Sequence, residues 1–506
     1  MIKTSLSRGG HFAIEYLRHT TLNCRAIAYF LGGVISIKLA VLFLVGPVIW
    51  PDTEAYISFA DAILAHGQVF DRVGFGGGPA APILVFRLAG YPLVLAAAKL
   101  ISPQYYGQVT TLFQILLNII AIVIMVRVLA RLSFTTAQIV FAIGLYAFSD
   151  SLLFDNSLLS DSIYSSLFNI VVFALLGHLV AGSRLTFVGA SALGLLWGFS
   201  TWTRDSGIYL TYLPIGLLIA IALRAPTGNL RRFGHLFTFM IVIFAMTGAY
   251  SGFNKYRTGE FFFSITSVEN WLRPVFDMAQ YGYADPFNDD DLVSQTVRDG
   301  MPNYEYPAQV AFVEKLHQRC ECTPRQLQSL VFRKYLTTVT HYPIGYIRVV
   351  WRNFHFFGLV GLLADPIATI NQFFEFATSL PHKFAPGLSI RNLLDLQRQF
   401  SAVTLLLMLL NALSTAAATV LFSLFLFGIP FMMVCASRGR EPIPLSLAIV
   451  GFLWFAFVSV SIAFSLVHYE ARHALPVFPA GCIGIVYAAF ETSRLLSRPA
   501  ARSPPS

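Results

Sequence analysis

Charged residues are scarce in this chain of 506 residues. Asp, Glu, Lys and Arg together make up 12% of the sequence, whereas 56% of it is hydrophobic and the mean hydropathy is +0.65. A soluble domain of this size needs far more charge on its surface. The composition therefore excludes a soluble globular protein and indicates a polytopic membrane protein.

Cysteine is scarce too, with five residues scattered along the chain, which excludes a disulfide framework. Only Cys320 and Cys322 lie in a polar stretch. A disulfide across one intervening residue is strained, and a metal site would need further Cys or His ligands at set spacing. The sequence therefore favours neither arrangement for this pair.

A basic stripe with interleaved aromatic residues is also lacking. The formal net charge is +9, but the Lys and Arg residues stand between apolar runs and so report membrane topology. We therefore expect no nucleic-acid partner. No internal repeat is visible, which disfavours a transporter built from duplicated halves.

The N-terminal stretch does not have the pattern of a cleaved signal peptide. Lys3, Arg8, Arg18 and Arg25 precede an apolar segment that is too long for a signal peptide, and no small-residue cleavage site follows it. We expect a cytoplasmic tail followed by a retained first helix.

Apolar runs of roughly 18 residues or more predict about ten membrane helices, with nine to thirteen as the range. Their orientation follows from Lys and Arg in short loops, which places both termini in the cytoplasm. Gly90–Ile101 is too short to span and predicts an interfacial helix. The expected helices cover about 26–50, 105–128, 136–154, 160–181, 186–203, 207–223, 235–252, part of 402–436, 443–466 and 474–492.

Four parts follow from this topology. Residues 1–252 form a transmembrane core whose first external loop, 51–104, carries the opening acidic motif. Residues 253–410 form a periplasmic region with membrane-associated helices, in which 308–318 and 325–355 are predicted to be helical. Residues 411–492 return to the membrane, and 493–506 are a cytoplasmic tail. Within the external region, Asp289 to Asp291 are one candidate cation site, although such a charge run is usually a solvated face.

Five charged residues far apart in sequence converge on the outer side: Asp52, Asp161, Arg87, Arg204 and Arg472. Ionisable groups at a membrane border are costly unless they are paired or wetted, so the set predicts a water-filled cavity. The alternative is that each is a helix-end residue reaching for the interface. A carboxylate can accept the proton of an attacking hydroxyl, while arginines bind a departing phosphate.

The motifs around these residues resemble those of membrane glycosyltransferases of the GT-C fold. The likeness is greatest to the polyprenyl-phosphate-sugar branch that contains the family 39 protein O-mannosyltransferases and the lipid A aminoarabinose transferases. It covers residues 50 to 480, and Leu88-Ala89 replace the two prolines usual in the second motif. The segments that carry it are Trp50-Pro-Asp-Thr-Glu-Ala-Tyr56, Arg87-Leu-Ala-Gly-Tyr-Pro-Leu93, Leu158-Leu-Ser-Asp-Ser162, Thr203-Arg-Asp-Ser-Gly207, Asn254-Lys-Tyr-Arg-Thr-Gly-Glu-Phe261 and Tyr469-Glu-Ala-Arg-His-Ala-Leu-Pro476.

The resemblance implies an inverting transferase in which Asp52 is the general base. Glu54 competes for that role, because the family's acidic pair is often adjacent and here Thr53 intervenes. Asp161 would orient a substrate. The remaining candidates are Arg87, Arg204 and Arg472 for the donor phosphate, and Tyr56, Tyr91, Tyr469, His468 and Asn270 for other substrate contacts.

The expected activity is sugar transfer from a polyprenyl phosphate to a hydroxyl acceptor, a lipid, glycan or protein, at the periplasmic face of a bacterial inner membrane. Two or three arginines can neutralise one phosphate, so no cofactor is required and a divalent metal is not indicated. A flippase for a lipid-linked glycan and an inactive relative acting as an assembly partner remain the alternatives.

Overall fold

The computed structural model describes residues 23–44, 46–67, 87–148, 150–183, 185–224, 233–300, 306–354, 420–438, 442–467 and 471–496. Over these ranges every named element is a helix, and eight helices are long and apolar enough to cross a membrane. The chain is therefore a multi-pass, all-helical membrane protein, as the composition and apolar runs predicted.

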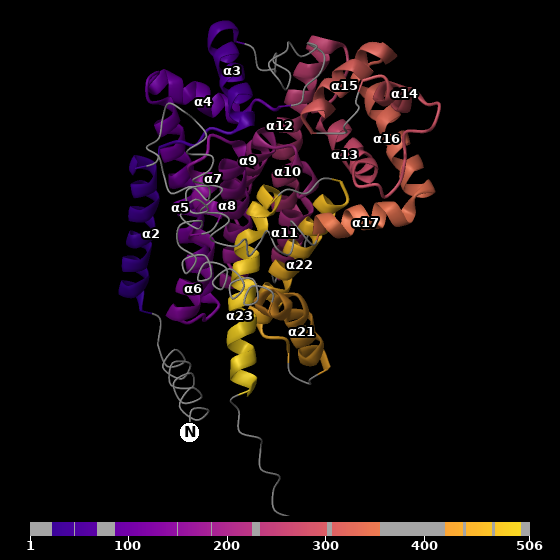
Figure 1. The fold of residues 1–506 in the computed structure, drawn as a ribbon. Coiled ribbons are helices and arrows are strands. Elements are labelled where there is room, and N and C mark those ends of the chain that lie inside the picture. The colour runs from indigo at the N-terminus through magenta and orange to yellow at the C-terminus, as the bar shows by residue number, and fades with distance from the viewer. Residues whose placement is uncertain are drawn as a thin grey trace, which may run out of the picture.

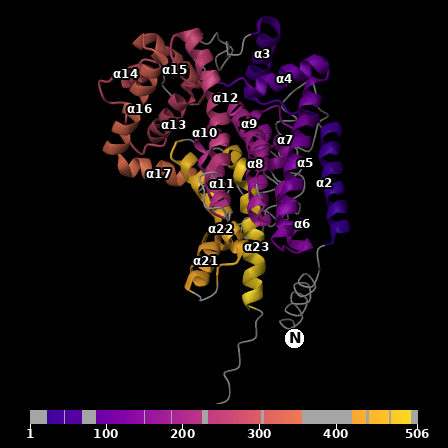
Figure 2. The same ribbon diagram turned by 180° about the vertical axis from the view of Figure 1, so that it is seen from behind.

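The first part of the chain forms an upright bundle, seen from two sides in Figures 1 and 2. Helix α8 lies near its centre, between α5 and α9, and is buried along most of its length. Short α3 and α4 lie at one end of the bundle. The bounds are α2 Cys24–Leu44, α3 Pro51–His66, α4 Gly90–Ile101, α5 Tyr106–Arg131, α6 Thr136–Ala147, α7 Asp150–Asp155, α8 Ser160–Ala181, α9 Phe187–Thr203, α10 Ser206–Tyr209, α11 Tyr212–Arg224 and α12 Gly234–Thr258.

The last helices return to the same bundle. Helix α23 packs against α6 and α22, so the two ends of the described chain share one core. Helix α2 begins, and α23 ends, at the end of the bundle away from α3 (Figure 1). The bounds are η3 Leu424–Gly428, α21 Ile429–Arg438, α22 Leu445–Ser465, η4 Ala471–Val477 and α23 Phe478–Leu496.

Between α12 and η3 the described chain forms a group of helices beside the bundle, which we call the external group because it lies outside the bundle (Figure 1). Its apolar core, in which Phe276, Val313 and Val331 are fully buried, also includes Phe59 of α3 and Tyr250 of α12. Unlike the bundle helices, α13 and α17 have one apolar and one polar face. The bounds are α13 Thr266–Gln280, α14 Leu292–Arg298, α15 Tyr306–Cys320, α16 Pro324–His341 and α17 Pro343–Asn353.

Several predicted helices have different ends. The first stops at Leu44 and not near residue 50, because Gly46 has a positive φ of 80° and Pro47 follows it. The third divides into α6 and α7, since Phe148 leaves the helical region (φ −106°, ψ 14°).

The stretch predicted as one helix over 325–355 divides into α16 and α17 at Pro343, because the residue before a proline is driven out of the helical region. The seventh helix runs six residues further than predicted, to Thr258. By contrast, α4 and α8 begin and end where the sequence predicts. Of the expected span within 402–436, residues 402–419 lie outside the described residues.

Candidate active site

Helix α3, at one end of the bundle, carries Asp52. Pro51 occupies the first helical position, and the hydroxyl of Thr53 accepts a hydrogen bond from the Trp50 N–H at 2.9 Å, which satisfies a backbone donor at the helix start. Asp52 therefore lies in the first turn, where the helix dipole favours a negative charge. Glu54 lies in the same turn but is exposed.

The chain before α3 is joined to the chain before α8. Val48 pairs with Ser157 in a short parallel bridge, which includes a hydrogen bond from the Leu158 N–H to the Val48 carbonyl at 2.9 Å. The Thr53 hydroxyl also donates to the Leu158 carbonyl at 3.0 Å. Because Asp161 follows three residues later, this bridge fixes the two acids relative to each other.

Asp161 lies in the first turn of α8 and pairs with Arg204. Its side chain is 3% exposed, and that of Arg204 is 19% exposed. Arg204 directly follows α9 with an extended backbone (φ −154°, ψ 122°), so its side chain leaves the helix end and reaches across to α8. A carboxylate this buried needs such a partner.

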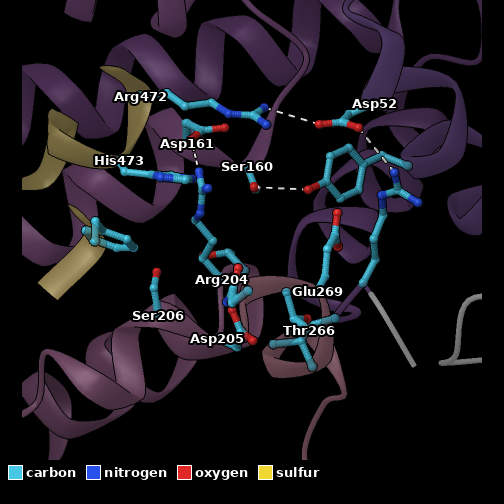
Figure 3. Close-up of a pocket in the computed structure, with 16 residues that line it drawn as sticks. Asp52, Ser160, Asp161, Arg204, Asp205, Ser206, Thr266, Glu269, Arg472 and His473 are labelled. Carbon is cyan, nitrogen blue, oxygen red and sulfur yellow. Dashed lines mark hydrogen bonds and ion pairs between the residues drawn. The ribbon is translucent and has the colours of Figure 1, made fainter. Parts of the chain in front are cut away.

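Asp52 lies between two arginines from opposite ends of the sequence. Arg87 contacts one carboxylate oxygen at 3.3 Å, and Arg472 contacts the other at 3.2 Å (Figure 3). Both distances exceed the 2.7–2.9 Å typical of strong charge-assisted hydrogen bonds. A guanidinium carries five N–H donors, so each arginine can bind Asp52 and an anion together.

A glycine brings two of these segments together. A Cβ atom on Gly90 would lie 2.4 Å from the backbone carbon of Trp202 and 2.6 Å from the nitrogen of Thr203. Only glycine allows the start of α4 to approach the end of α9 so closely. The contact places Arg87 and Arg204, which flank it, on the same cavity.

A cavity of about 140 Å³ lies among these side chains (Figure 3). Helix α13 of the external group forms one wall, and the η4 segment with Phe464 forms another. Its lining residues are Asp52, Tyr56, Arg87, Leu88, Ser160, Asp161, Thr203, Arg204, Asp205, Ser206, Thr266, Glu269, Asn270, Phe464, Arg472 and His473.

Most residues predicted from the sequence meet at this cavity. All five converging charges line it, together with Tyr56 and Asn270. Glu54 and Tyr91 do not line it: Glu54 faces solvent, and Tyr91 is fully buried with its hydroxyl donating to Gln114 at 3.1 Å. His468 and Tyr469 lie outside the described residues.

Sequence reasoning missed Glu269, which points into the cavity from α13 (Figure 3). Thr266, Glu269 and Asn270 stand at positions i, i+3 and i+4 of one helix, so they share a face. The apolar residues of α13 were the available signal, because they define a buried face and thereby the polar face opposite.

Asp205 adds a further carboxyl at the base of the cavity. Burial raises the pKa of Asp205 above its usual value of 3.8, and a hydrogen bond from the Ser264 hydroxyl at 2.9 Å and the nearby Arg204 act against this rise. Asp205 is thus easier to protonate than a free aspartate.

The candidate cation site at Asp289 to Asp291 holds a lysine of the chain itself. The Lys334 ammonium contacts Asp289 at 2.8 Å, Asp291 at 2.7 Å and the Ser294 hydroxyl at 2.8 Å. Asp291 also caps α14 by accepting from the Ser294 N–H. In the described part of the chain, no group of three His, Cys, Asp or Glu is placed to hold a metal ion.

Two further features bear on the predictions. Cys320 and Cys322 form a disulfide, an arrangement that the sequence did not favour. Inside the bundle, Lys38 pairs with Asp155 at 2.5 Å, and both side chains are at most 1% exposed.

Comparisons with known proteins do not identify the family of this chain. No protein-family model and no curated protein sequence matches this chain. Two crystal structures of ArnT from Cupriavidus metallidurans are similar, each with a TM-score of 0.35. The apo form is 14% identical over 92% of this chain and 77% of ArnT, and the form bound to undecaprenyl phosphate is 16% identical over 93% and 78%. Likeness at this level supports no statement about this chain's activity.

Proposed function

We propose that this chain is a GT-C-type membrane glycosyltransferase that moves a sugar from a polyprenyl phosphate to a hydroxyl acceptor at the periplasmic face of a bacterial inner membrane. One observation carries the proposal: Asp52 lies between Arg87 and Arg472 in a cavity that also holds the Asp161–Arg204 pair. A base and an anion site are thereby adjacent.

In the proposed reaction Asp52 accepts the proton of the acceptor hydroxyl, and the acceptor oxygen attacks the anomeric carbon. The bond from that carbon to the phosphate oxygen breaks and the lipid phosphate leaves, so the configuration at the anomeric carbon is inverted. Arg87, Arg204 and Arg472 stabilise the charge on the departing phosphate. Asp161 holds Arg204 in place for this task.

The α13 wall has the chemistry for the sugar itself. Thr266, Glu269 and Asn270 offer a hydroxyl, a carboxylate and an amide to the cavity from one helix face. Such groups both accept and donate hydrogen bonds, as sugar hydroxyls require. We assign this face to the donor sugar and the arginines to its phosphate.

Asp52→Asn tests the base assignment. Because a positioned general base contributes about 10²–10⁴-fold, we expect transfer from radiolabelled polyprenyl-phosphate sugars to fall by roughly that factor at unchanged expression. Asp61→Asn is the matched control, since Asp61 lies on the same helix, is more than half exposed and pairs with Lys99 outside the cavity. Normal transfer by Asp52→Asn, or an equal loss in Glu54→Gln, contradicts the assignment.

A flippase would need charged groups along a path through the bilayer. Lys38 and Asp155 lie inside the bundle, but they contact each other, Ser151 and Ser162. That arrangement is satisfied within the protein and fits a structural pair better than a pathway. Transbilayer movement of a lipid-linked sugar without transfer or hydrolysis would favour the flippase.

A further inference from the structure

Helix α17 differs in direction from the membrane-spanning helices. In Figures 1 and 2 it lies across the molecule, whereas α2, α22 and α23 stand upright. It is also tied to the end of α22, a helix that can span a membrane: the Tyr346 hydroxyl donates to the Leu466 carbonyl at 2.7 Å, and the Asn353 amide donates to the Ser465 carbonyl at 3.4 Å. These contacts fix α17 beside the C-terminal end of α22.

One face of α17 is apolar and exposed. Ile344, Ile347 and Trp351 are 69%, 64% and 61% exposed, and their spacing of three and four residues places them on one side of the helix. Gly345 and Val349 face the protein on the opposite side. Exposure of three large apolar side chains on one short helix is unfavourable in water.

The surroundings of this face identify what covers it. Ile462 and Leu466 at the adjoining end of α22 are also exposed, so the apolar face continues the lipid-facing surface of a spanning helix. Trp is typical of the membrane–water border. Arg348 on the exposed side and Arg352 are the charged residues of α17, which carries no acidic residue.

We propose that α17 lies in the outer-leaflet interface of the membrane, with Ile344, Ile347 and Trp351 among the acyl chains and Arg348 beside anionic lipid headgroups. A basic amphipathic helix binds such surfaces through its apolar area and through attraction to anionic lipids. This inference does not depend on the proposed transferase activity.

The contacts of α17 extend to α13, which lines the cavity. Helix α17 packs against α13, and the Gly345 backbone lies so close to the Tyr283 carbonyl that a Cβ would be 3.1 Å from it. The Tyr346 hydroxyl bonds that of Tyr335 on α16 at 2.7 Å. Lipid contact at α17 therefore sets the height of the α13 wall above the membrane.

Spin labels on the full-length protein in lipid nanodiscs test the proposal. The background carries Cys24→Ser and Cys435→Ser, the two exposed free cysteines. A nitroxide is attached at Ile347→Cys, and a matched one at Gln295→Cys on the exposed side of α14. The measurement is the collision rate of each label with oxygen, which dissolves in lipid, and with a water-soluble nickel chelate.

We expect the Ile347 label to collide several-fold more with oxygen and several-fold less with the chelate than the Gln295 label. Frequent chelate collisions would mean that the face lies in water, and low rates with both reagents would mean that protein covers it. Either result overturns the proposal.

The charge of the lipid is tested in the same samples. We expect the Ile347 label to lie deeper in phosphatidylglycerol nanodiscs than in phosphatidylcholine nanodiscs, and Arg348→Gln to remove that difference. Equal depth in both lipids with Arg348 present would overturn the assignment to anionic headgroups.

Discussion

Two clusters of opposite charges in this protein have different forms. Lys334 contacts Asp289, Asp291 and Ser294 within the external group, so its ammonium is satisfied by the chain itself. In the cavity, Asp52 is held by two arginines at longer distances beside open space. We call the first a closed cluster and the second an open cluster. Charge content alone does not distinguish them, but the space beside the charges does.

Lys38 and Asp155 are a second closed cluster, and breaking it has the largest expected effect. Lys38→Met leaves Asp155 buried without its cation, which costs roughly 3–5 kcal/mol when one partner of a buried pair is removed. We expect a lower unfolding temperature and poorer recovery in size-exclusion chromatography. The double variant Lys38→Met/Asp155→Leu should regain most of the loss, and a double variant no more stable than the single one would count against a closed cluster.

The open cluster should respond differently when its cation is removed and the partner carboxylate is then neutralised. In the proposed reaction, Arg204→Gln removes one donor to the leaving phosphate, and loss of one such donor typically lowers the rate by about 10²–10³-fold. Neutralising its partner as well, in Arg204→Gln/Asp161→Asn, should not restore transfer, because the arginine is needed for the substrate. Recovery of transfer in the double variant would make the pair structural. Arg224→Gln, at the far end of α11, is the control.

Lys334→Met should have a smaller effect on stability. Asp289 is 57% exposed and Asp291 35% exposed, so water screens the charges left behind and we expect a loss of about 1–2 kcal/mol. Amide hydrogen exchange in α14 and α16 measures this loss of stability. Adding Asp289→Asn and Asp291→Asn should recover stability, since Asn can still cap α14.

The smallest expected effect is a dependence on pH. Burial alone would raise the pKa of Asp291, but hydrogen bonds from Lys334 and Ser294 outweigh it and hold that pKa below its usual value of 3.8. A carboxyl with a lowered pKa contributes stability above its unfolded pKa and loses it as pH falls through the folded one. Exchange in α14 should therefore rise below about pH 4. Lys334→Met should weaken this dependence, and an unchanged profile in that variant would contradict the assignment.

The sequence predicted the bundle better than its external group. Helix α8 is a long apolar run between a polar start and Gly182, and the membrane imposes that pattern directly. The convergence of Asp52 and Asp161 followed from topology alone. Glu269 was missed because the apolar residues of α13 identify its polar face but not the direction in which that face turns.

Two assignments by motif did not reach the cavity. Tyr91 follows Gly90 in the second motif, yet Gly90 packs closely against α9 and the Tyr91 hydroxyl is buried against Gln114. Glu54 lies two residues after Asp52 on a helix, which turns it away by about 200°. The sequence places residues near a site, but packing decides which side chains face it.

The two arginines that hold Asp52 come from positions 87 and 472, and this spacing has a consequence for biogenesis. A nascent chain inserted as far as α22 already contains Asp52, Asp161 and Arg204, but it lacks Arg472 and the η4 wall. The η4 wall is attached to α8 by a hydrogen bond from the Ser165 hydroxyl to the Leu475 carbonyl at 3.0 Å. The cavity is complete only after the helix that follows η4 has entered the membrane. Membrane insertion itself thus delays the completion of the cavity until nearly all of the described chain has been made.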